Sequence, residues 1–116
     1  LMELLREAVP GKVKLNTRTG YILINTQEVV FCKADGNYTR IRLIHGNEEL
    51  ITQNLGTIEE LLQPGGFFRA SRSYLLNLKY LARVDRKNCS CMMEYGGTSV
   101  SIKIPPQKIK LLESSF

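Results

Sequence analysis

The sequence predicts a mostly β domain with one short helix and a short helical turn near its C-terminal end. First, apolar and polar residues alternate along several short runs, most regularly over residues 98–104. This period of two places successive side chains on opposite faces of a strand. Second, turn signals containing glycine separate the runs at intervals of roughly 8–12 residues, a spacing typical of β domains. Third, a clear helical spacing of apolar residues is confined to residues 55–62.

The N-terminal part of the sequence predicts a linker followed by a hairpin. Residues 1–10 are interpreted as a linker or as the tail of an upstream segment, because Pro10-Gly11 would stop a helix there. The domain itself is assigned to residues 11–116. Residues 12–16 and 21–25 flank the turn residues Arg18-Thr19-Gly20, and this arrangement predicts an antiparallel hairpin.

The next three runs predict a set of strands joined by tight turns. Residues 28–34 are apolar on both faces, which indicates a central buried strand. Asp35-Gly36-Asn37 then predicts a turn into a strand over residues 38–44, whose odd-numbered side chains form the apolar face. His45-Gly46-Asn47 predicts a second turn, into a strand over residues 48–52.

The middle of the chain contains the predicted helix. Asn54 is a suitable N-cap for residues 55–62, and residues 64–66 (Pro-Gly-Gly) end the helix. Strand-like residues 67–71 and 80–86 follow, and an irregular turn is expected to connect them.

The C-terminal part predicts a last hairpin and a short helical turn. Residues 90–95 and 98–104 flank Gly96-Gly97, and Pro105-Pro106 stops the second strand. The remaining segment is expected to dock on the body of the domain. Its apolar residues at helical spacing are Ile109, Leu112 and Phe116.

Composition restricts the possible functions. The chain has 116 residues, of which 43% are hydrophobic, and a formal net charge of +5. One domain that is large enough to bury a hydrophobic core is therefore expected, and the charge favours a polyanionic partner. The 3 cysteines form no disulfide framework, so a reducing, cytoplasmic compartment is predicted. Cys89 and Cys91 are two positions apart and are expected to lie on one face of a strand. With His45 they fall short of the four ligands of a structural zinc site, and no metal or other cofactor is predicted.

Catalytic patterns are poorly represented in the sequence. The single histidine, His45, lies in a turn whose residue types explain it better than catalysis does. Glu48-Glu49 and Glu59-Glu60 are adjacent pairs whose side chains diverge, so neither pair resembles an acid/base dyad. We therefore predict that the domain is not an enzyme.

An unusual concentration of cations lies in residues 65–87. Six lysine and arginine side chains are opposed there only by Asp85, whereas a solvated face normally mixes both signs. Arg72 is the most informative of them, because it lies between Ser71 and Ser73 in the expected irregular turn. Loops on a rigid scaffold are where binding residues concentrate. Phosphate attraction by the other cations would be independent of sequence.

Two other functions remain open from these residues alone. A β-rich protein-interaction or ligand-sensing module would carry the positive charge incidentally. A single-stranded nucleic-acid binder would use exposed aromatic side chains as stacking platforms.

The order of motifs resembles the LytTR family of DNA-binding domains. The resemblance is carried by "VVFCKADGNYTRIRL" (29–43), "LGTIEELL" (55–62) and "FFRASRSYLLNLKYLARV" (67–84), and it covers roughly residues 12–112. In the last block six positions match the family pattern, namely Phe68, Arg69, Arg72, Ser73, Tyr74 and Asn77.

This resemblance implies an elongated stack of small antiparallel sheets that binds double-stranded DNA through loop side chains. It also implies the output domain of a transcription regulator of the two-component or a similar type. An upstream receiver or membrane-sensor domain would then be its partner, and a dimer could form on repeated DNA sites. The implied DNA-binding residues are Asn37, Tyr38, Thr39, Arg40, Ser71, Arg72, Ser73, Gln107 and Lys108.

The sequence departs from the family pattern where the last strand joins the C-terminal helix. Family members commonly have a basic run there, whereas this chain has Pro105-Pro106-Gln107-Lys108. An amide such as that of Gln107 can bind an adenine edge, and Lys108 can hold a phosphate. We expect these two residues to make whatever contact occurs at this junction, and Asn77 to bind backbone through its amide.

Overall fold

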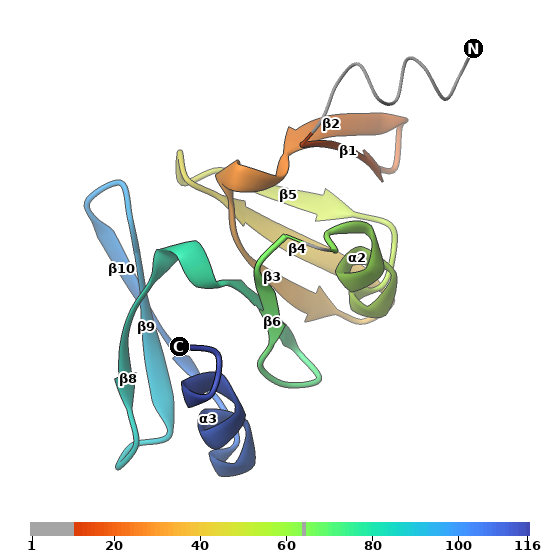
Figure 1. Cartoon of the computed structure of the whole chain (residues 1–116). Coiled ribbons are helices and arrows are strands. Elements are labelled where there is room, and N and C mark those ends of the chain that lie inside the picture. Colours follow the sequence, from red (N-terminus) through yellow and green to blue (C-terminus); the bar gives the residue numbers. More distant parts are fainter. Residues whose placement is uncertain (1–10, 64) are drawn as a thin grey trace.

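The computed structural model describes residues 11–63 and 65–116 (Figure 1). The predicted linker or helix tail over residues 1–10 lies outside the described residues. In chain order the elements are β1 (Lys12–Asn16), β2 (Tyr21–Asn25), a short 3-10 turn (Thr26–Glu28), β3 (Val29–Asp35), β4 (Tyr38–Leu43), β5 (Glu48–Ile51), α2 (Leu55–Leu61), β6 (Phe67–Arg69), β7 (Tyr74–Asn77), a second 3-10 turn (Leu78–Tyr80), β8 (Leu81–Asp85), β9 (Ser90–Tyr95), β10 (Thr98–Lys103) and α3 (Pro106–Glu113). The prediction of a mostly β domain is confirmed.

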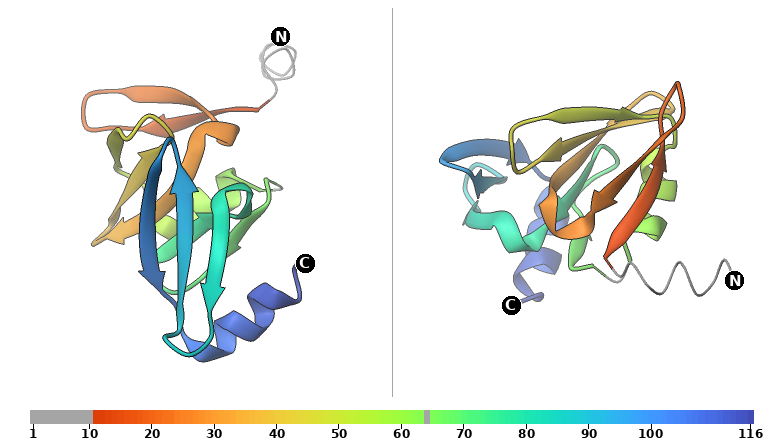
Figure 2. Two further views of the ribbon diagram at one scale, coloured as in Figure 1. Left: turned by 90° about the vertical axis from the view of Figure 1, so that its left-hand side faces the viewer. Right: turned by 90° about the horizontal axis from the view of Figure 1, so that it is seen from above.

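The strands form three antiparallel sheets. The largest has the strand order β5-β4-β3-β7-β6, and β3 lies at its centre. The hairpin β1-β2 is a separate two-stranded sheet, and β10-β9-β8 is a three-stranded sheet. Figure 2 shows this three-stranded sheet lying across the larger sheet in one view, with α3 leading away from its lower end.

The strand β3 separates two hydrophobic cores. Val29 and Cys32 belong to one core, whereas Val30 and Phe31 belong to the other. This assignment breaks simple alternation because the register with β4 shifts between Val29 and Phe31, as a β-bulge does. The prediction of a strand that is buried on both faces is therefore confirmed.

One core lies between the larger sheet, α2 and the β1-β2 hairpin. The helix begins after Asn54, whose side chain accepts a hydrogen bond from the backbone N–H of Thr57 at 2.9 Å. Such a cap satisfies a donor that the helix itself leaves unpaired. Leu55 and Ile58 of α2 are buried against Ile51 and Leu75 of the sheet. The predicted cap and the burial of Leu55, Ile58 and Leu62 are thus confirmed, whereas Leu61, also expected on the apolar face, is 39% exposed.

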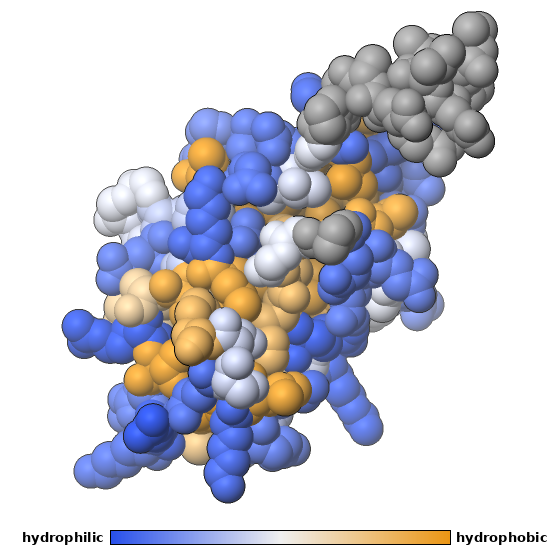
Figure 3. Space-filling view, in the orientation of Figure 1, coloured by the Kyte–Doolittle hydropathy of each residue, from blue (hydrophilic) through white to orange (hydrophobic). Residues whose placement is uncertain are grey.

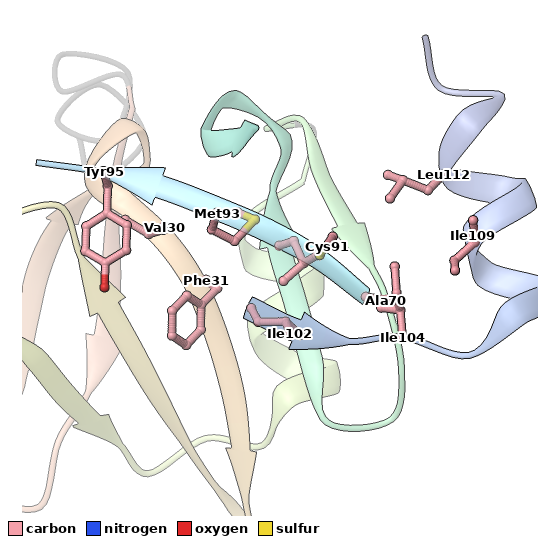
Figure 4. Packing of buried hydrophobic residues seen from close by; sticks show 11 residues of the cluster. Val30, Phe31, Ala70, Cys91, Met93, Tyr95, Ile102, Ile104, Ile109 and Leu112 are labelled. Atoms are coloured by element: carbon pink, nitrogen blue, oxygen red, sulfur yellow. The ribbon is translucent and has the colours of Figure 1, made fainter. Parts of the chain in front are cut away.

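The other core lies between the larger sheet, the three-stranded sheet and α3. Figure 4 shows Phe31 of β3 near Ile102, and Ala70 near Ile104, with Ile109 and Leu112 of α3 at the end of the cluster. Each of these residues is at most 6% exposed. Packing in this core fixes the position of α3 relative to the chain around Ala70.

The structure corrects the expected irregular turn between residues 71 and 80. Tyr74–Asn77 is a strand, β7, that pairs with both β3 and β6. Leu75 and Leu76 are both fully buried, in opposite cores. An interior strand that is covered on both faces shows no polar alternation, so the pattern did not reveal it. The true turn is confined to residues 70–73.

Three smaller expectations are also corrected. Phe116 is 78% exposed, so it does not dock on the body of the domain. Cys89 lies in the β8-β9 turn with φ of 51°, and not on a strand face beside Cys91. The C-terminal helix begins at Pro106, because proline is well suited to the first turn of a helix. Cys91 is buried, and this burial raises the pKa of its thiol to about 11.

Asn77 ties together two distant parts of the backbone, as predicted. Its side-chain Nδ2 donates to the carbonyl oxygen of Val29 at 2.8 Å, and its Oδ1 accepts from the N–H of Lys79 at 3.0 Å. The side chain is only 3% exposed. Buried amides of this kind are stable only when their polar atoms are satisfied.

Candidate nucleic-acid interface

Three chain segments meet at one end of the larger sheet. Lys33 of β3 is opposite Tyr74 of β7, and the N–H of Ala34 donates to the carbonyl of Ser73 at 2.8 Å. Because these strands are antiparallel, the β3-β4 turn around Asn37 lies at the same end of the sheet as the 70–73 turn. The N-terminus of α3 approaches this end through the packing of Ile104 and Ile109 with Ala70.

A shallow groove of about 560 Å³ separates the 70–73 turn from the start of α3. The two sides of the groove come from segments more than thirty residues apart in the sequence. Its lining residues are Arg69, Ser71, Arg72, Ser73, Pro105, Gln107 and Lys108. Five predicted contact residues, from the serine-arginine-serine turn and from the C-terminal junction, are therefore brought together.

Arg72 and Lys108 give the groove its free positive charge. Arg72 is exposed and Lys108 is half-buried. Neither side chain has an ion pair among the residues that the structure describes. Both cationic groups are thus available to an anionic ligand.

Arg69 also lines the groove, but its guanidinium is already occupied. Its Nε donates to the carbonyl of Ser71 at 2.7 Å, and its Nη2 donates to the carbonyl of Arg72 at 3.1 Å. Its Nη1 donates to Oε1 of Glu59 on α2 at 2.8 Å. Sequence reasoning identified Arg69 only as part of a matching motif and missed this contact with the turn.

The predicted residues near the β3-β4 turn are arranged differently. Asn37 is exposed in the turn, and Tyr38 is half-buried at the start of β4. Thr39 is fully buried, and its hydroxyl donates to the carbonyl of Gln53 at 2.8 Å. Its side chain has no exposed surface to offer to a ligand, so its role in the structure is packing. Alternation along β4 already placed Thr39 on the apolar face.

Arg40 is exposed on β4 but is neutralised by neighbouring carboxylates. Its Nε lies 2.7 Å from Oδ2 of Asp35, and its Nη1 lies 3.4 Å from Oε1 of Glu48. The hydrogen bond with Asp35 is the main cause of the raised pKa of Arg40. None of the described lining residues of the groove comes from this pair of strands. Arg40 is therefore a weaker source of attraction for an anion than Arg72.

The start of α3 has a distinct backbone arrangement. Pro105 precedes the helix and provides no side-chain cap, and Pro106 occupies the first turn without an N–H group. The N–H of Lys108 donates to the carbonyl of Pro105 at 2.9 Å, which leaves Gln107 at the exposed beginning of the helix. The two prolines thus provide a preformed helix start at this junction.

Two further concavities lie along the three-stranded sheet. Arg83 and Asp85 line both of them, and Arg86 and Glu113 form an ion pair at the edge of one. Neither concavity contains a predicted contact residue. Residues 11–63 and 65–116 contain no group of three or more potential metal ligands, and no helix among them is long and apolar enough to span a membrane.

The surface around α3 is mixed in character. Figure 3 shows apolar side chains gathered over the region of α3 and surrounded by projecting hydrophilic ones. Leu111 and Phe116 are exposed apolar residues at this end of the chain, at 54% and 78%. Hydrophilic side chains dominate the lower margin of this view, where α3 begins.

The fold and the groove define a small β domain that presents cations on loops, and comparison with known proteins gives its class. A family model for the LytTr DNA-binding domain matches residues 19–115, so the chain belongs to the LytTR family. This is a family of DNA-binding domains, typical of response-regulator output domains, and not a family of enzymes. The resemblance recognised from the sequence is thereby confirmed.

One solved structure shows the same fold. The LytTr DNA-binding domain of a putative methyl-accepting/DNA response regulator from Bacillus cereus aligns with a TM-score of 0.68 and 18% sequence identity. The alignment covers 91% of this chain and 96% of that one. Comparison with curated protein sequences gives no significant match.

Proposed function

We propose that this domain binds double-stranded DNA in a sequence-specific manner, as the output domain of a transcription regulator. The supporting observation is the groove between the 70–73 turn and the start of α3, in which the cations of Arg72 and Lys108 are unpaired among the described residues. Membership of a DNA-binding family supports the same conclusion. Binding through loop side chains suits a domain in which the groove is formed by a turn and a helix start.

The groove residues are assigned different roles. Arg72, exposed on a turn whose backbone is hydrogen-bonded, is suited to a bidentate contact with the O6 and N7 atoms of guanine. Gln107 is suited to an adenine edge, and Lys108 to a phosphate. Asn37 is an exposed turn residue at the same end of the sheet and would contact a neighbouring part of the duplex.

The proposal includes the molecular context. A receiver domain or a membrane sensor upstream would supply the regulatory signal, and two copies of the domain would bind repeated DNA sites. Cytoplasmic DNA is the expected target, and no cofactor is needed for such contacts. The target sequence is to be found by selecting bound duplexes from a random library.

Single-stranded nucleic acid is a less suitable ligand for this groove. Base stacking needs exposed aromatic rings. Among the described residues, the lining of the groove includes no aromatic side chain, and the most exposed tyrosine, Tyr21, lies on the β1-β2 hairpin. A protein-interaction module without DNA affinity would need an acidic partner to pair with Arg72 and Lys108.

Fluorescence anisotropy with a selected duplex, a random duplex and the single strands tests the proposal. The selected duplex should bind most tightly, and affinity should fall as salt increases, with a logarithmic slope of about −0.9 for each phosphate neutralised. Equal affinity for all ligands, preference for single strands, or no binding at low salt would contradict the proposed function.

A further inference from the structure

The side chain of Arg69 links the turn that carries Arg72 to the helix α2. One guanidinium binds the carbonyl groups of both Ser71 and Arg72, and its remaining nitrogen binds the carboxylate of Glu59. The side chains of Arg69 and Glu59 are 28% and 32% exposed, so the pair is largely shielded from solvent. Charge-assisted hydrogen bonds of this kind are stronger than neutral ones.

The other hydrogen bonds of the turn lie on both sides of Arg72. The N–H of Ser73 donates to Oγ of Ser71 at 3.1 Å, and the carbonyl of Ser73 accepts from the N–H of Ala34. The N–H of Ala70 donates to the carbonyl of Tyr74 at 3.0 Å. Together with the two hydrogen bonds that Arg69 donates to carbonyl groups, these bonds hold the backbone of the turn, while the side chain of Arg72 remains exposed.

The helix provides a rigid base for Glu59. Asn54 caps α2, and Leu55 and Ile58 bury its apolar face in the core. An arginine is required at the other end of the link, because its planar fork presents several donors in fixed directions, whereas a lysine ammonium is a compact point charge. Because α2 is fixed by its packing, the hydrogen bonds of Arg69 hold the turn in a fixed position relative to α2.

We propose that Arg69 and Glu59 are positioning residues that hold the turn so that Arg72 is preorganised to bind a base. This inference rests on the proposed function, and it assigns a specificity role to two residues that need not touch DNA. Preorganisation lowers the ordering cost that a flexible side chain incurs on binding. It should strengthen binding to the selected site and leave nonspecific attraction unchanged.

A matched pair of substitutions on α2 tests the proposal. Glu59→Ala and Glu60→Ala each remove one negative charge from the same helix, but Glu60 is exposed and has no ion pair among the described residues. Loss of a carboxylate near DNA should strengthen binding to any duplex. Glu60→Ala should therefore equal or exceed the parent on both selected and random duplexes.

Glu59→Ala should behave differently on the two duplexes. On random DNA it should match Glu60→Ala, whereas on the selected duplex it should lose about tenfold in affinity, because the turn is no longer fixed. Loss of positioning thus predicts that Glu59→Ala binds the selected duplex more weakly than the parent, whereas removal of a negative charge alone predicts stronger binding. Arg69→Lys, which keeps the charge, should show the same selective loss.

Two further measurements separate positioning from folding and from failure of the proposed function. Glu59→Gln retains an oxygen acceptor for Arg69 and should recover most of the selected-site affinity, with unchanged melting. In the free protein, hydrogen exchange at the N–H groups of Ser71 and Ser73 should accelerate in Glu59→Ala, and exchange in β3 and β7 should not.

The possible results distinguish failure of the proposed DNA binding from failure of the positioning role. A parent that shows no preference for its selected duplex contradicts the proposed function, and the exchange measurement alone then decides whether Glu59 holds the turn. If the parent is specific but Glu59→Ala equals Glu60→Ala on both duplexes, the positioning role is overturned. Unchanged exchange at Ser71 and Ser73 overturns it as well.

Discussion

At the scale of single residues, Arg72 differs from Arg69, the other arginine that lines the groove, because the charge of Arg72 is free among the described residues. Arg40, Arg42 and Arg69 are each bound to a carboxylate. Arg72→Ala should lower affinity for the selected duplex by about 1–3 kcal/mol, or roughly ten- to hundredfold, through loss of a bidentate contact. Anisotropy on selected and random duplexes at one salt concentration measures this loss.

Arg83→Ala is the matched control for Arg72→Ala. Arg83 is exposed on β8, away from the groove, and has no ion pair among the described residues. Its removal should weaken binding less, and equally on both duplexes. Melting temperatures of both variants should remain close to that of the parent, because exposed arginines contribute little to folding. If Arg72→Ala binds the selected duplex as the parent does, Arg72 does not read a base.

The sequence allowed prediction of an exposed Arg72 but not of the role of Arg69. Two small hydroxyl residues flank Arg72, and such a neighbourhood indicates a turn. The partner of Arg69 is Glu59, ten positions away on a helix, and pairing across elements depends on tertiary packing. From the sequence alone, Glu59 is only one of two adjacent acids on the predicted helix.

At the scale of elements, β7 shows why an interior strand was missed while the hairpins were predicted. The hairpins carry local signals, such as Gly96-Gly97 between β9 and β10. β7 has only four residues, and its place between β3 and β6 is set by contacts that are distant in sequence. Asn77, the last residue of β7, is nevertheless expected from the sequence to bind backbone, because it matches the motif of the family.

Replacement of Asn77 should destabilise the whole larger sheet. Asn77→Ala leaves the carbonyl of Val29 and the N–H of Lys79 without the partners they have now. The free energy of unfolding should fall by about 1–3 kcal/mol, as expected when buried polar groups lose their partners. Urea unfolding followed by circular dichroism provides the measurement.

Asn47→Ala supplies the comparison for Asn77→Ala. Asn47 is exposed in the β4-β5 turn, so the same chemical change should alter the free energy of unfolding by no more than about 0.5 kcal/mol. Equal stability of the two variants would mean that the amide of Asn77 is not a structural tie.

At the scale of the whole molecule, one arginine joins the two larger sheets. Nη1 of Arg42 on β4 donates to the hydroxyl of Tyr95 on β9 at 3.1 Å, and its Nη2 donates to Oε2 of Glu48 at 2.8 Å. The guanidinium also lies 5.6 Å from the ring centroid of Phe31. The hydrogen bond from Arg42 is the main cause of the lowered pKa of Glu48.

This link predicts a loss of stability in acid. Because the pKa of Glu48 is below its usual 4.5 in the folded protein, the unfolded chain binds the proton first. The contribution of Glu48 is therefore present above about pH 4.5 and is lost as the pH falls through the lower, folded-state value. Thermal melts between about pH 7 and about pH 3 should show a smaller fall for Glu48→Gln than for the parent.

Glu49→Gln separates the effect of Glu48 from a general effect of charge. Glu49 is the next residue of β5 and has no ion pair among the described residues. Its variant should follow the acid response of the parent. An identical response of the two glutamine variants would mean that the pairing of Glu48 with Arg42 does not cause the loss of stability in acid.

The pairing of β3 with β7 also affects the order in which parts of the chain can fold. The bond between Asn77 and Val29 closes a loop of 48 positions, so the central strand waits for a partner that is synthesised much later. Contacts of such high sequence separation slow folding, typically to milliseconds or seconds in β proteins. Residues 70–73 and the start of α3 are expected to take their positions only after that closure. A nascent chain is therefore expected to form its hairpins first and the groove beside the 70–73 turn last.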